Sequence, residues 1–182
     1  MELKSLNESL AAFGPPALFV GEDRRRYDGM CAEFMVAVNP NDFIEQMLTR
    51  DIVDLEWDIL RLRRLKAGVY ASAIALGLGS ALAEQKVQVK GDFVDSWIRK
   101  EPTAIKQMNE FVTKGEVDLD RLMADCLSDS LDHIDRLDLH ITRVEARRNA
   151  HLREIEQRRA ALGSRLRSAV AAIEAKPTSH AA

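Results

Sequence analysis

The chain has 182 residues, of which 46% are hydrophobic and 5% aromatic, so it is long enough to bury a core made mainly of aliphatic side chains. Acidic and basic residues nearly balance at a net charge of −3, which excludes a strong overall attraction to nucleic acid or acidic lipid. Cys31 and Cys126 lie far apart, and Glu2 and Lys4 interrupt any signal-peptide pattern at the start. We therefore expect a cytoplasmic protein with reduced thiols.

The N-terminal part of the chain predicts an arm followed by one helix. Residues 1–16 end in Gly14-Pro15-Pro16, which stops any helix and marks this stretch as an arm. Gly21-Glu22-Asp23 then indicates a helix start. Apolar residues follow at three- and four-residue spacing: Tyr27, Met30, Cys31, Phe34, Met35 and Val38. This spacing predicts an amphipathic helix of about four turns.

A long second helix is predicted over residues 42–83. Asn39-Pro40 ends the first helix, and Asp42 with Glu45 three residues later forms the pattern of a capping box. One apolar stripe continues along it through Ile44, Leu48, Ile52, Leu55, Ile59, Leu62, Val69, Ala73 and Leu76. A separate polar stripe contains Arg50, Asp54, Asp58, Arg61 and Arg64. Residues 67–83 are uncharged but contain glycine and serine, so we expect this half to be covered on all sides by other helices rather than inserted into a membrane.

The region after this helix predicts a connector and two short helices. Residues 86–90 alternate like a strand, but a lone run without a partner strand favours an extended connector. Phe93, Trp97 and Ile98 recur at helical spacing before Glu101-Pro102. Thr103 is the expected cap of a further helix that ends at Lys114.

The final helix is predicted over residues 118–175, with Asp118 as its N-cap and a staple between Val117 and Leu122. Its apolar stripe runs through Leu127, Leu131, Ile134, Ile141, Leu152, Ile155, Leu162, Leu166 and Ile173, with Leu137, Val144 and Val170 one residue aside. The stripe drifts as in an ordinary helix, which favours a bundle over a long regular coiled coil. Roughly 55 residues at 1.5 Å each span about 80 Å. We therefore expect the helix to bend near Asn149 or Gly163, or to project toward a partner chain.

Together these elements predict an all-α fold, an elongated helical bundle with two long antiparallel helices and several short ones. Residues 17–175 form the predicted single domain, between the arm at 1–16 and a disordered tail at 176–182.

Charge is segregated along the final helix. Residues 116–140 contain eight acids against two arginines, whereas residues 141–169 contain eight arginines against three glutamates. These arginines are the candidate contact residues: Arg143, Arg147, Arg148, Arg153, Arg158, Arg159, Arg165 and Arg167. Clustered arginine on one helix is typical of phosphate-backbone binding, although a solvated polar face has the same composition.

A third interpretation of the arginines is an internal partner. The helix that begins at Asp42 is acidic first and basic next, so an antiparallel arrangement would place its acids opposite the arginines. This arrangement predicts position 66 near 135 and position 42 near 159.

The sequence gives little support for a metal, nucleotide or catalytic site. Asp129, His133 and His140 share one side of a helix, but an ordinary polar face has the same residues and the HExxH spacing of zinc sites is absent. No phosphate-binding glycine motif is present, and neither cysteine is marked as a nucleophile. We therefore expect no metal, no cofactor and no enzyme activity.

Two stretches carry a resemblance: residues 21–65, with the GED helix start and a Trp followed by RLRRL, and residues 146–166, which are rich in arginine. They resemble a group of small bacterial helical proteins with no assigned function. The resemblance implies neither an activity nor a site.

These observations predict a non-enzymatic helical interaction or assembly protein, a subunit of a larger complex or a homo-oligomer, whose partner is another protein or a second copy. The alternative is a nucleic-acid-binding accessory protein that uses the arginine-rich helix, and membrane binding is not expected.

Overall fold

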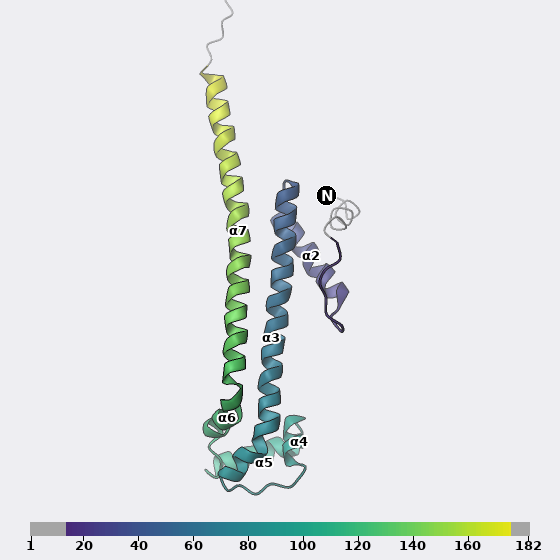
Figure 1. The fold of residues 1–182 in the computed structure, drawn as a ribbon, viewed down its shortest axis with the longest axis vertical. Coiled ribbons are helices and arrows are strands. Elements are labelled where there is room, and N and C mark those ends of the chain that lie inside the picture. The colour runs from purple at the N-terminus through teal and green to yellow at the C-terminus, as the bar shows by residue number, and fades with distance from the viewer. Residues whose placement is uncertain (1–13, 176–182) are drawn as a thin grey trace, which may run out of the picture. The chain divides into compact units, whose positions relative to one another are not determined.

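The computed structural model describes residues 14–175, and in this part of the chain it is all-α with no strand, as the sequence predicts. The elements are α2 (Arg24–Val38), α3 (Phe43–Glu84), α4 (Phe93–Ile98), α5 (Pro102–Thr113), α6 (Leu119–Leu127), the 3₁₀ turn η1 (Ser128–Ser130) and α7 (Leu131–Glu174). Figure 1 shows α3 and α7 as the long helices. Most of the predicted arm and the whole predicted tail lie outside the described residues.

The chain divides into two compact units, and both long helices contribute to each. Unit 1 contains Met1–Ile59 and Arg143–Ala182, and unit 2 contains Leu60–Thr142. Each unit is described below by itself.

In unit 1, α2 packs on the first half of α3. The Asp23 carboxylate accepts a hydrogen bond from the Arg25 amide at 2.8 Å, which caps the first turn of α2. Buried Tyr27, Cys31 and Met35 contact Val53 and Trp57 of α3: three apolar side chains spaced by one helical turn meet two on the facing helix. The rings of Tyr27 and Trp57 meet edge to face with their centroids 5.5 Å apart.

The start of α3 confirms the capping role of Asp42, with the reciprocal hydrogen bond of the predicted capping box displaced by one residue to Asn41. The Asp42 carboxylate accepts from the Glu45 amide at 2.8 Å, while the Glu45 carboxylate accepts from the Asn41 amide at 2.9 Å. Asn39 ends α2 in the left-handed conformation with φ 45°, a region that Asn tolerates better than most residues. The helix boundaries between α2 and α3 are therefore set by local hydrogen bonding.

A polar cluster sits between α2 and α3. Tyr27 donates its hydroxyl hydrogen to Asp54, and the buried Arg50 guanidinium lies over the Tyr27 ring, 5.2 Å from its centroid. Burial raises the pKa of both the Tyr27 hydroxyl and the Cys31 thiol, so both stay protonated near neutral pH. Cys31 is therefore a packed thiol, and Arg50 belongs to the core although its spacing suggested a polar stripe.

The core of unit 2 is apolar and gathers the end of α3 with α4, α5 and α6. Its buried members are Leu78, Ala81, Leu82, Phe93, Ala104, Met108, Val117, Leu122 and Cys126. Val117 and Leu122 both belong to this cluster, and the Asp118 carboxylate accepts from the Arg121 amide at 3.1 Å, as the predicted start of the last helix requires. A Cβ added at Gly77 would lie only 2.9 Å from the Cys126 Cα, so glycine permits the close approach of α3 and α6.

Two details of the prediction are wrong and one is refined. The predicted last long helix is present, but the 3₁₀ turn η1 separates its first part, α6, from α7, and the Ser128 hydroxyl donates to the Asp125 carbonyl at 3.0 Å. The N-cap position of the helix after α4 is Glu101 and not Thr103, because Pro102, with its fixed φ, occupies the first turn; the Glu101 side chain makes no capping hydrogen bond. Within unit 2, the apolar half of α3 is covered on one side only, and Leu76 remains 84% exposed.

Candidate interaction surface

Three of the eight candidate arginines of α7 face α3 within unit 1. The pairs are Arg148 with Glu56 at 2.5 Å, Arg158 with Asp42 at 3.2 Å and Arg159 with Glu45 at 2.8 Å. Buried Ile155 packs between them against Leu48 and Ile52. Arg148 pairs with Glu56, whereas Arg158 and Arg159, about three turns later on α7, pair with Asp42 and Glu45 at the start of α3. This is the order of an antiparallel pair.

The charge pattern predicted this register closely. Asp42 was expected near position 159, and the structure pairs it with Arg158. In unit 2, Lys66 was expected near position 135 and pairs with Asp138 at 2.7 Å, about one helical turn away. For Arg148, Arg158 and Arg159, the internal-partner interpretation therefore describes the structure.

Arg159 and Glu45 form the centre of this network. The Glu45 side chain is 4% exposed and accepts hydrogen bonds from both Arg159 and the Asn41 amide, which together hold the pKa of the carboxyl below its usual value. Arg159 also donates to the carbonyl oxygens of Val38 and Asn39 at the end of α2. One guanidinium thus joins the end of α2, the start of α3 and the side of α7.

The other five candidate arginines are exposed and make no ion pair within the part of the chain that the structure describes: Arg143, Arg147, Arg153, Arg165 and Arg167. At 3.6 residues per turn, Arg147 and Arg165 lie along one edge of the α3-facing line and Arg167 lies along the other edge. Arg153 lies farther round, toward the opposite side of the helix. The structure therefore does not bring these five together into a single basic face.

An apolar stripe continues the α3-facing side of α7 beyond its last ion pair with α3. Its members, with their exposed fractions, are Leu162 at 51%, Leu166 at 59%, Val170 at 52% and Ile173 at 72%. They follow Arg148, Ile155 and Arg159 at helical spacing and so lie on the same face. Because α3 begins at Phe43, beside Arg158 and Arg159, no described element of unit 1 covers this stripe.

The sequence indicated this stripe but not its exposure. Leu162, Leu166 and Ile173 fall on the periodic apolar line of the predicted helix, with Val170 one position aside. Periodicity identifies an apolar face, but only the start of α3 determines where that face loses its cover. α7 passes through Asn149 and Gly163 as one continuous helix.

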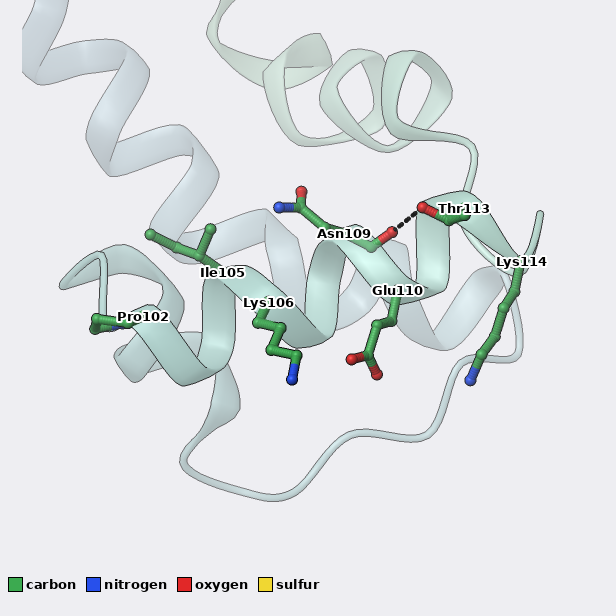
Figure 2. A pocket seen from close by; sticks show the side chains of 7 residues that line it. All are labelled: Pro102, Ile105, Lys106, Asn109, Glu110, Thr113 and Lys114. Atoms are coloured by element: carbon green, nitrogen blue, oxygen red, sulfur yellow. Dashed lines mark hydrogen bonds between the residues drawn. The ribbon is translucent and has the colours of Figure 1, made fainter.

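Two spaces in unit 2 lie at the surface of its helices. The space of about 570 Å³ in Figure 2 is lined by Pro102, Ile105, Lys106, Asn109, Glu110, Thr113 and Lys114. These residues belong to one face of α5 and its C-cap, so the space is an open helix surface. A second space of about 380 Å³ lies between α3 and the α6–η1 segment, beside Asp125 and Asp129.

The described residues also contain no suitable group of metal ligands. Among residues 14–175, no group of three or more His, Cys, Asp and Glu side chains is arranged to hold a metal ion. Asp129 belongs to η1, whereas His133 and His140 are exposed on α7, so the three do not share one continuous helix face.

Comparisons with known proteins add no relative. No protein-family model, curated protein or solved structure matches this chain.

Proposed function

We propose that this chain is a non-enzymatic helical interaction protein of the cytoplasm, and that residues 160–174 of α7 bind an amphipathic helix of a partner protein. The observation that carries the proposal is the exposed stripe of Leu162, Leu166, Val170 and Ile173. It continues a face that already packs against α3 in unit 1, so it has the geometry of a helix-binding surface. A contiguous exposed apolar face of this kind is typical of a protein interaction site.

The chemistry of the partner follows from the way α7 binds α3. The first half of α3 places carboxylates opposite arginines on each side of a small apolar contact. A partner helix on the next turns of α7 would run antiparallel to it, present Leu, Ile or Val to the stripe, and place Asp or Glu beside Arg165 and Arg167. Such edge charges would set orientation, while the apolar contact supplies most of the affinity.

A second candidate function is binding to nucleic acid, and the five exposed arginines without an ion pair favour it. It ranks lower because these arginines occupy different sides of α7, and Glu154 and Glu156 lie among them. If several of them contacted phosphates, affinity for generic DNA or RNA would fall steeply with salt.

Quantitative affinity capture from native cells, with nuclease treatment, separates the two functions. We expect Leu166→Glu/Val170→Glu to weaken a protein partner by at least about tenfold, because it places carboxylates in the apolar contact. Ser168→Glu/Ala171→Glu adds the same charge on the opposite face and should leave binding unchanged. The interaction is then reconstituted from the purified partner.

Loss of capture in Arg165→Gln/Arg167→Gln but not in the stripe variant, together with nuclease sensitivity, would support nucleic acid instead. Equal capture by all variants would contradict both functions.

A further inference from the structure

A second uncovered surface lies on α3 in unit 2, away from the side that packs on the apolar core. Leu65 is 50% exposed and Leu76 is 84% exposed. They belong to a line of six residues that follow one another at steps of four, three, four, three and four: Leu65, Val69, Ser72, Leu76, Gly79 and Ala83. This regular alternation is the spacing of a coiled-coil seam.

The seam has no ionisable side chain, although the chain as a whole is 30% charged. Leu65, Ser72, Leu76, Gly79 and Ala83 are all exposed, while Leu78 and Leu82 on another side of α3 are fully buried. Only 22% of the apolar window of α3 is buried, even though α3 is long and apolar enough, by length and composition, to span a membrane. A surface this apolar favours a covering partner.

We propose that a second copy of this chain covers the seam, with the two α3 helices antiparallel and related by a two-fold axis near residue 74. The seam contains larger residues and small ones in complementary positions. Antiparallel pairing about residue 74 places each larger side chain against a small one: Leu65 against Ala83, Val69 against Gly79, and Leu76 against Ser72. Two-fold symmetry repeats the three layers, so one face fits itself.

The surroundings of the small residues admit the partner helix. A Cβ added at Gly79 would meet only the Val94 Cγ2 atom, at 3.9 Å, so space for a partner side chain exists above it. Small residues let two helix backbones approach closely, and an uncharged seam brings no like charges together.

A lipid bilayer fits the same surface less well. The uncharged stretch of residues 67–83 spans about 26 Å as a helix, less than the ~30 Å hydrocarbon core of a membrane. Ser72, Gly79 and Ala83 also contribute little apolar area, whereas in the antiparallel pair they supply the space that Leu and Val require.

This self-association rests on unit 2 and is independent of the function proposed for α7. Disruption of the α3 seam leaves the Leu162 to Ile173 stripe untouched, so either proposal can fail alone.

Sedimentation of the purified full-length chain over a range of concentrations tests the proposal. We expect the wild-type chain to sediment as a dimer. Leu76→Glu should convert it to a monomer, raise the dimer dissociation constant at least about 100-fold and leave the helical circular dichroism unchanged. Ser72→Leu should act similarly, because it fills the space for the partner's Leu76. Leu139→Glu, at a residue that is 49% exposed on α7, is the matched control and should remain paired.

Cysteine cross-linking tests the direction of the pair. Positions 65 and 83 lie about 27 Å apart along one helix, too far for a disulfide within a chain. Leu65→Cys/Ala83→Cys should form a disulfide-linked dimer on mild oxidation, while Leu65→Cys alone should not. The wild-type chain controls for the buried thiols of Cys31 and Cys126.

A single chain at all concentrations would overturn the proposal, as would a dimer that survives both Leu76→Glu and Ser72→Leu. Binding of a monomeric wild type to phosphatidylcholine vesicles, lost in Leu76→Glu, would overturn it in favour of a lipid surface. Cross-linking of Leu65→Cys alone would overturn the antiparallel arrangement.

Discussion

Unit 1 and unit 2 hold their helices together in different ways. In unit 1, the α3–α7 contact has a small apolar centre at Leu48, Ile52 and Ile155, flanked by three ion pairs. In unit 2, the end of α3 packs in a larger apolar cluster and approaches α6 closely at Gly77. We infer that charge contributes more to direction and register in unit 1, whereas close packing of apolar side chains contributes more in unit 2.

The largest expected effect is loss of a core side chain in unit 2. Leu82 is fully buried, so Leu82→Ala should lower the free energy of unfolding by about 3 kcal/mol through lost burial and a residual cavity. Urea denaturation measures this change. Leu139→Ala, at an exposed position, should stay within about 0.5 kcal/mol, and equal effects at the two sites would show that the apolar cluster is not the main support of unit 2.

The charged centre of unit 1 gives the next effect. Glu45→Gln keeps the shape of the side chain but removes the charge that faces Arg159, so it should lower the free energy of unfolding by about 2 kcal/mol. Asp138→Asn in unit 2 should have a clearly smaller effect, because the Asp138 side chain is 50% exposed. A larger loss from Asp138→Asn would reverse the comparison between the units.

Two glycines of α3 test how much the close packing of α3 and α6 stabilises unit 2. Gly77→Ala should lower the free energy of unfolding by about 1.5 kcal/mol, because its Cβ would lie 2.9 Å from the Cys126 Cα. Gly79→Ala should be neutral or slightly stabilising, since its nearest contact is 3.9 Å away and alanine favours helix. Thermal unfolding of both variants checks the pair, and equal losses would contradict a specific contact at Gly77.

The units should also differ in their response to pH. Hydrogen bonds from the Glu45 amide and Arg158 lower the pKa of Asp42, and those from Arg159 and the Asn41 amide lower the pKa of Glu45. Their stabilisation is therefore present above the ordinary value of 4.5 for Glu and lost as pH falls through the lowered values. Asp138 raises the pKa of Lys66 above 10.5, so this contribution is present below that value and lost at higher pH.

Thermal unfolding followed between pH 6 and pH 3 should show a decline that is smaller in Glu45→Gln than in the wild type. The same decline in both proteins would show that Glu45 does not contribute to the loss of stability at low pH.

Much of the fold could be predicted because its signals are local. Asp23, Asp42 and Asp118 cap helices through their own neighbours, so the sequence marks the three starts. The pairing of Asp42 with the region of Arg159 could also be predicted, because charge order along two helices defines a direction.

Some burial could not be predicted, because it depends on distant elements. Arg50 was expected on a polar stripe but is buried beside Tyr27, since α2 packs over that side of α3. The apolar half of α3 was expected to be covered, yet the elements of unit 2 reach only one side of it. The break at η1 was missed because Ser128-Asp129-Ser130 contains neither glycine nor proline.

Amide hydrogen exchange of α7 tests the central claim most directly, with the isolated chain compared with its complex purified from native cells. We expect the amides of residues 160–174 to exchange rapidly in the isolated chain and to become strongly protected in the complex. Residues 148–159, which already pack against α3 in unit 1, should change little. Equal exchange of residues 160–174 in both samples would contradict the role of this stripe as the docking surface.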